Sequence, residues 1–144
     1  MAELAPLMRD QRKVDADHLR LLEIFHFVFA GLALVGIGFL GLHYAFMHAL
    51  FSNPAMWQNQ KGGGPPPGQF LAAFVWVYFV LGALLIVAAI ANLASGLFIR
   101  RRMCRIFSLI VAGVNCIQIP FGTTLGVFTI VVLLRDSVRE LYEV

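Results

Sequence analysis

The sequence predicts an all-α membrane protein, a bundle of four transmembrane helices with both termini in the cytoplasm. Of its 144 residues, 60% are hydrophobic and 13% are charged, whereas a soluble domain has about 25% charged residues. All eight acidic residues lie on the same predicted side of the membrane as the arginines. Four arginines lie between two apolar runs: Arg100, Arg101, Arg102 and Arg105. By the positive-inside rule, they mark a cytoplasmic turn between two helices.

The first two spans are expected over residues 21–51 and 70–99. Thirty-one helical residues reach about 46 Å, so the first helix must tilt in a hydrocarbon core of about 30 Å or project from it. Asp15 or Asp17 is expected to cap its start. Between the two spans, residues 52–69 are rich in glycine and proline and contain Trp57, which suits an outer loop at the membrane interface.

The remaining apolar run is interrupted by Pro120-Phe-Gly122. One interpretation is a single kinked span that leaves the C-terminus outside. The other is a short hairpin of third and fourth spans, over about 103–119 and 123–138. The turn chemistry at Pro120 and the basic residues Arg135 and Arg139 favour the hairpin. The whole chain, 1–144, is then one integral membrane domain.

Two strings near the ends of the chain, His18-Leu-Arg-Leu-Leu-Glu-Ile-Phe-His26 and Pro120-Phe-Gly-Thr-Thr-Leu-Gly-Val-Phe-Thr-Ile-Val-Val-Leu-Leu134, resemble those of small bacterial four-span membrane proteins of unassigned function. The resemblance implies a multi-pass protein of the bacterial inner membrane. It implies no activity.

The first span carries a face rich in small residues. At 100° per residue, one arc contains Ala30, Gly31, Gly38, Gly41 and Ala45, whereas Gly36 points elsewhere. Small side chains allow another backbone to approach closely. We therefore expect this face to pack against a helix of the same chain or of a second copy.

Uncharged polar residues within the spans are costly against lipid, so Asn92, Asn115, Gln118 and Thr129 are expected to face protein or a water-filled path. Glu23, His26, Asn92 and Thr129 have similar predicted depths and form a candidate polar cluster. In it, Glu23 should accept a hydrogen bond from Asn92, His26 or a nearby arginine. The cluster is either a polar lock between helices or a site for a solute or proton.

Few residue patterns suggest catalysis, metal binding or haem binding. Glu23 and His26 have the Glu-x-x-His spacing of di-iron bundles, but no other span carries an acid. All four histidines lie on or just before the first span, so bis-histidine haem ligation within one chain has no second helix to use. Haem or a metal remains an alternative that would use His26, His43 and His48; otherwise no metal or cofactor is expected.

The sequence thus favours a non-enzymatic membrane protein that acts by helix–helix assembly, as a homo-oligomer or as an accessory subunit of a membrane partner. The first alternative is a small oligomeric channel or solute pore, and the second is a haem- or metal-binding redox protein. The lipid bilayer is the expected environment, and nucleic acid is excluded by the placement of the charges. Contact with anionic lipid is expected at Arg100, Arg101, Arg102 and Arg105.

Overall fold

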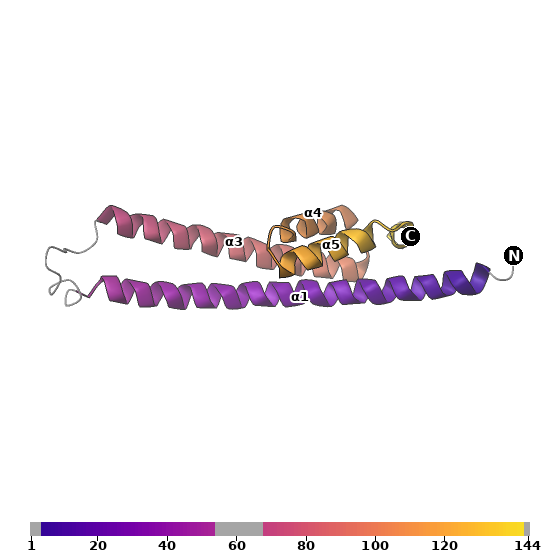
Figure 1. Cartoon of the computed structure of the whole chain (residues 1–144), viewed down its shortest axis with the longest axis horizontal. Coiled ribbons are helices and arrows are strands. Elements are labelled where there is room, and N and C mark those ends of the chain that lie inside the picture. The colour runs from indigo at the N-terminus through magenta and orange to yellow at the C-terminus, as the bar shows by residue number, and fades with distance from the viewer. Residues whose placement is uncertain (1–3, 54–67, 143–144) are drawn as a thin grey trace. The chain divides into compact units, whose positions relative to one another are not determined.

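The computed structural model of the chain describes residues 4–53 and 68–142, and every regular element within those ranges is a helix (Figure 1). The elements are α1 (Leu4–Phe51), α3 (Gly68–Arg101), α4 (Arg105–Asn115), α5 (Phe121–Leu133) and α6 (Asp136–Glu140). The all-α class predicted from the sequence is confirmed. Most of the glycine- and proline-rich loop expected at 52–69, with Trp57, lies outside the described residues.

α1 is longer than the first predicted span, and α4 and α5 are shorter than the third and fourth predicted spans. α1 continues back to Leu4, so Asp15 lies within the helix and does not cap its start. α4 has 11 residues and α5 has 13, about 17 Å and 20 Å of helix. The segment predicted as the end of the fourth span turns at Arg135 and continues as α6.

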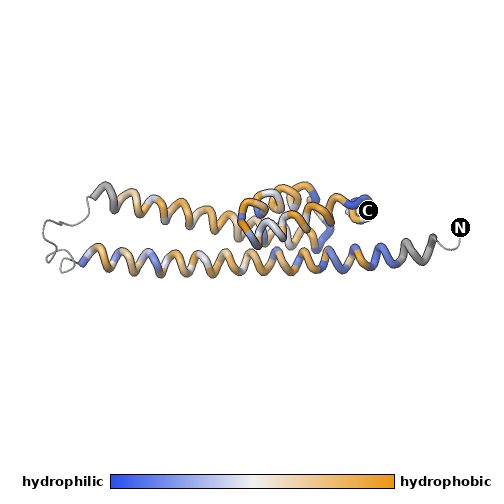
Figure 2. Tube along the Cα trace, viewed as in Figure 1, coloured by the Kyte–Doolittle hydropathy of each residue, from blue (hydrophilic) through white to orange (hydrophobic). Residues whose placement is uncertain are grey.

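Two helices are long and apolar enough to cross a membrane. They contain the segments Asp10–Phe51 and Ala72–Arg101, and only 11% and 6% of their most apolar windows are buried. A helix in the core of a soluble protein would bury most of such a surface. Figure 2 shows the hydrophobic colouring along these two helices and the hydrophilic colouring near the start of α1.

Contacts divide the chain into two compact units, and α1 and α3 each run through both. The first unit comprises Met1–Ala30 and Ile90–Val144, and the second comprises Gly31–Ala89. The core of the first unit combines α1, the end of α3, α5 and α6. Its buried apolar residues are Leu19, Leu22, Ile99, Leu125, Val132, Leu133 and Val138.

Within the first unit, α4 and α5 form an antiparallel hairpin. A Cβ atom added at Gly122 would lie 2.5 Å from the Asn115 carbonyl oxygen, and one added at Gly126 would collide with the carbonyl oxygen of Ala112. Near the open end of the hairpin, Arg105 Nε donates a hydrogen bond of 2.7 Å to the Leu133 carbonyl. The two helices pack this closely because α5 has no side chain at its two contact points.

The turn from α3 into α4 is a Schellman motif with an unusual residue. The Met103 amide donates to the Phe98 carbonyl at 2.9 Å, and the Arg102 amide donates to the Ile99 carbonyl at 3.2 Å. Arg102 takes the left-handed conformation, with φ 53°, at the position where glycine is most common. Cys104, with φ 48°, is left-handed as well.

In the second unit, α1 and α3 run antiparallel. Among the partly buried positions of α1 in this unit is a series spaced by three and four residues, as in left-handed helix pairs: Ala33, Gly36, Leu40, His43 and Met47. A Cβ atom added at Gly36 would lie 3.6 Å from Leu85, and one at Gly82 would lie 3.7 Å from Leu40. The contact between these helices thus uses Gly36 and larger side chains.

Candidate functional site

The interior of the first unit contains an unusual number of polar side chains for a protein with this composition. Every helix of the unit except the short α6 contributes at least one. Each is at most 3% exposed: Asp15, His26, Asn92, Ser95, Ser108, Asn115 and Thr129. Because a buried polar group is costly without a hydrogen bond, the question for each of these residues is where its bonds go.

Asn92 of α3 and Asn115 of α4 pair through both amide groups. The Asn115 amide nitrogen donates to the Asn92 side-chain oxygen at 2.8 Å, and the Asn92 nitrogen donates back to the Asn115 oxygen at 3.2 Å. Both residues were expected to face protein, and both are buried. The reciprocal pair ties the last turn of α4 to α3.

Four of these residues have a buried side-chain atom with no hydrogen-bond partner among the described residues: Asp15 Oδ2, His26 Nε2, Ser95 Oγ and Ser108 Oγ. His26 Nδ1 lies 2.9 Å from the Leu22 carbonyl oxygen. A carbonyl oxygen only accepts, so Nδ1 carries the proton and Nε2 of the neutral ring is the acceptor that lacks a donor. His26 and Ser95 are each one residue from the contact between Phe27 and Gly96, and so lie at about the same level of the two helices.

The remaining members of the predicted polar cluster have local or ionic partners. Thr129 Oγ1 donates to the Leu125 carbonyl of its own helix at 2.8 Å. Glu23 pairs with Arg100 at 3.7 Å, and its side chain is 20% exposed. That Glu23, His26, Asn92 and Thr129 act as one cluster remains a prediction.

Gln118 is the one of the four polar residues that is not buried. It lies beyond the end of α4 and is exposed. Its carbonyl oxygen accepts hydrogen bonds from the Gly122 amide at 2.8 Å and from the Thr123 amide at 3.2 Å. Its side chain does not pack within the described chain, because the helix in which it was expected ends three residues earlier. That it faces a water-filled path remains a prediction.

Polar and charged side chains connect the N-terminal third of α1 with the junction of α5 and α6. Arg135 Nη1 lies 3.3 Å from Asp15 Oδ1 and also 3.3 Å from His18 Nδ1. The Asp15 side chain is fully buried and the Arg135 side chain is 36% exposed. Close by, burial raises the pKa of Tyr142 to about 12, although the charges of Arg102 and Arg105 act in the opposite direction.

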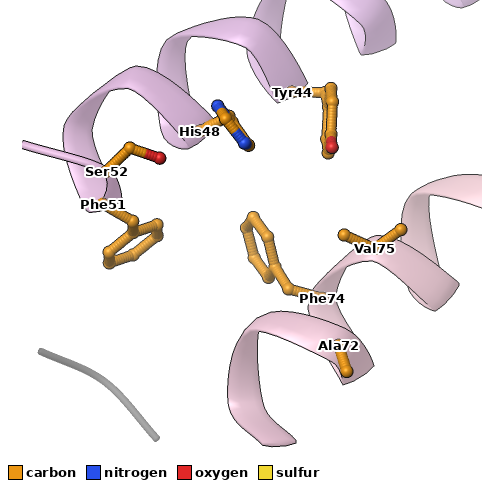
Figure 3. A pocket seen from close by; sticks show the side chains of 7 residues that line it. All are labelled: Tyr44, His48, Phe51, Ser52, Ala72, Phe74 and Val75. Carbon is orange, nitrogen blue, oxygen red and sulfur yellow. The ribbon is translucent and has the colours of Figure 1, made fainter. Parts of the chain in front are cut away.

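The second unit contains a cluster of aromatic and histidine rings. Nδ1 of His43 is hydrogen-bonded to the Tyr78 hydroxyl, and the two rings are stacked with centroids 5.8 Å apart. A cavity of about 220 Å³ lies beside this cluster (Figure 3). Its lining is mostly aromatic and apolar: Tyr44, His48, Phe51, Ser52, Ala72, Phe74 and Val75.

Three of the histidines thus have a polar contact at a ring nitrogen: His18 with Arg135, His26 with Leu22 and His43 with Tyr78. His48 packs against Tyr44. In the described part of the chain, no group of three or more histidine, cysteine or acidic residues is placed to hold a metal ion.

The face of small residues predicted on α1 is mostly open. A Cβ atom added at Gly31, Gly38 or Gly41 would have no neighbour within 4 Å, and Ala45 is exposed. Ala30, in the first unit, is buried. Gly36, which the sequence analysis placed on another side of the helix, is the glycine of this region that faces α3.

Sequence reasoning did not identify Ser108 or the role of Asp15. A signal for Ser108 was present, because α4 buries Ser108, Val111, Ala112 and Asn115 at spacings of three and four. For Asp15 no local signal existed, since its partner is 120 residues away. Comparisons with protein families, curated proteins and solved structures give no match for this chain.

Proposed function

We propose that the chain is a small integral membrane protein that acts by assembly, and that it binds a second copy of itself through the open small-residue face of α1. Four helices cross or enter the bilayer in this proposal, with both termini in the cytoplasm. The resemblance at the two ends of the chain adds the bacterial inner membrane as its location. No catalytic chemistry is assigned to it.

The observation that carries this proposal is the separation of two faces on one helix. The α1 face with Gly36, Leu40 and His43 is used by α3. On the face with Gly38 and Gly41, a Cβ atom added at either glycine would have no neighbour within 4 Å among the described residues. In lipid, helices associate through small residues that allow close backbone contact, and a second helix has room to approach here.

Isoleucine substitutions at neighbouring glycines test the proposal. Gly38→Ile and Gly41→Ile should leave the monomer folded, because the added side chains enter open space, but should abolish association. Gly36→Ile should instead weaken the α1–α3 contact at Leu85, by on the order of 1–3 kcal/mol. The measurements are thermal unfolding in detergent and energy transfer between labelled copies in vesicles. Unchanged energy transfer in Gly38→Ile and Gly41→Ile would overturn the proposal.

A second candidate function is the binding or passage of a small polar solute through the first unit. The observation in its favour is that three buried side-chain atoms of this unit, at His26, Ser95 and Ser108, have no hydrogen-bond partner among the described residues. A solute or water with both donors and acceptors would satisfy them. Ser95→Ala and Ser108→Ala should then reduce solute flux into vesicles while the protein stays folded. Unchanged flux would leave these serines a structural role alone.

A further inference from the structure

A polar pocket of about 410 Å³ opens in the first unit where α1 meets the end of α3. Its lining includes three arginines, Arg20 from α1, Arg100 from the last turn of α3 and Arg102 from the turn that follows, with Glu23 beside them. Leu19 and Ile99, which are buried, supply apolar lining. Residues from two separate elements thus bring three guanidinium groups to one cavity.

The charges of the pocket are not balanced within the described chain. Glu23 pairs with Arg100 at 3.7 Å. Neither Arg20 nor Arg102 forms an ion pair with a described carboxylate. Three arginines and one glutamate leave a formal charge of +2 in the lining. Like charges held near one another repel, and an anion in the pocket would relieve this repulsion.

The conformation of Arg102 is a separate feature of the same pocket. Its φ of 53° places it in the left-handed region, where a residue with a Cβ is about 1–2 kcal/mol less stable than in the right-handed region. Glycine would form the same Schellman motif without that cost. An arginine at this position therefore adds charge to the pocket at the expense of local stability, as strained residues at ligand sites do.

We propose that this pocket binds a phosphoryl group, through Arg20, Arg100 and Arg102. Guanidinium groups bind phosphate oxygens with paired, charge-assisted hydrogen bonds, and this makes arginine well suited to phosphate recognition. At about 30 Å³ per water molecule, the volume holds a phosphoryl group and several waters. The phosphoryl group belongs either to an anionic lipid head group or to a soluble phosphate. The site does not require self-assembly of the protein.

The test uses the purified full chain and four variants, Arg20→Gln, Arg102→Gln, Arg102→Gly and Arg101→Gln. Arg101 is the matched control, because it belongs to the same run of arginines expected to contact anionic lipid and is exposed like Arg20 and Arg102, but it does not line the pocket. Two probes are used: inorganic phosphate titrated into protein in neutral detergent, and nanodiscs with phosphatidylglycerol compared with phosphatidylcholine alone. The readout is the shift in unfolding temperature that each probe produces.

We expect Arg20→Gln and both Arg102 variants to weaken binding by about tenfold each, as the loss of a charge-assisted hydrogen bond would. Arg101→Gln should stay within about twofold of the parent chain, as expected of an exposed charge outside the pocket. Arg102→Gly is the sharpest variant, because without a ligand it should unfold at the same or a higher temperature than the parent. A purely structural arginine would not lose binding while the fold gains stability.

The two probes identify the source of the phosphoryl group. A response to phosphatidylglycerol alone assigns the pocket to a lipid head group, and a saturable response to inorganic phosphate assigns it to a soluble phosphate. No response to either probe would overturn the proposal. Equal losses in Arg101→Gln and Arg102→Gly would also overturn it, because binding would then follow general surface charge.

Discussion

The Asp15 carboxylate is fully buried, and its Oδ1 accepts a hydrogen bond from Arg135, which lies 120 residues further along the chain. Its second oxygen has no partner among the described residues. A buried carboxylate that loses its counter-ion is far more costly than the intact pair is stabilising. Arg135 should therefore matter chiefly because it prevents this cost.

Replacing Arg135 with methionine tests this directly. Arg135→Met should destabilise the protein by on the order of 2–3 kcal/mol, below the 3–5 kcal/mol of a fully buried pair because Arg135 is 36% exposed. Adding Asp15→Asn to Arg135→Met should restore part of the loss, since the isolated charge is gone. Unfolding in detergent measures both, with Asp17→Asn as the exposed control. A double variant no more stable than Arg135→Met would contradict this account.

At the scale of the element, the hairpin of α4 and α5 depends on glycines whose roles differ with their surroundings. A Cβ at Gly126 would meet the Ala112 carbonyl oxygen and Cys116 Sγ, whereas a Cβ at Gly113 would meet nothing within 4 Å. Gly113 is in the last turn of α4, where its backbone is still helical and glycine is less favourable than alanine. The same substitution should therefore have opposite signs at the two positions.

Gly126→Ala should destabilise the hairpin by about 1–3 kcal/mol, because the Ala112 carbonyl is helix backbone and cannot move aside without separating α4 from α5. Gly113→Ala should stabilise the protein by up to about 1 kcal/mol. Thermal unfolding of the two variants in one detergent gives the comparison. Similar effects in the two variants would mean that the close packing of α4 on α5 contributes nothing to stability.

Features set by residues close together in the sequence could be predicted, whereas contacts between distant segments could not. The turn at Pro120 was readable because turn residues act locally, and Asn92 and Asn115 were placed in the interior because polar groups avoid lipid. The small residues of the open face of α1 could be identified from the sequence, but which helix packs against that face could not. Periodicity identifies faces of a helix and does not say which face the chain uses for itself, so the contact through Gly36 was missed.

At the scale of the whole molecule, the short helices of the hairpin bear on the topology. α4 and α5 are about 17 Å and 20 Å long, less than the roughly 30 Å of a hydrocarbon core. Because they are antiparallel, α6 returns to the side on which α4 begins, whether the hairpin crosses the bilayer or only enters it. A test of the four-span topology must therefore determine on which side of the membrane the turn between α4 and α5 lies. The location of the C-terminus alone is not enough.

Reporter fusions and cysteine labelling locate both. Fusions after Arg102 and after Val144 should report the cytoplasm, and a fusion at Gly63 should report the outside, as the basic residues dictate.

In a chain with Cys104 and Cys116 replaced, Gln118→Cys tests the turn, because Gln118 is exposed between α4 and α5. A membrane-impermeant maleimide added outside should label it, because neighbouring residues and local thinning of the bilayer bring a short hairpin across. Protection from outside, with the C-terminal fusion still cytoplasmic, would mean that the hairpin is re-entrant and that only α1 and α3 span the membrane.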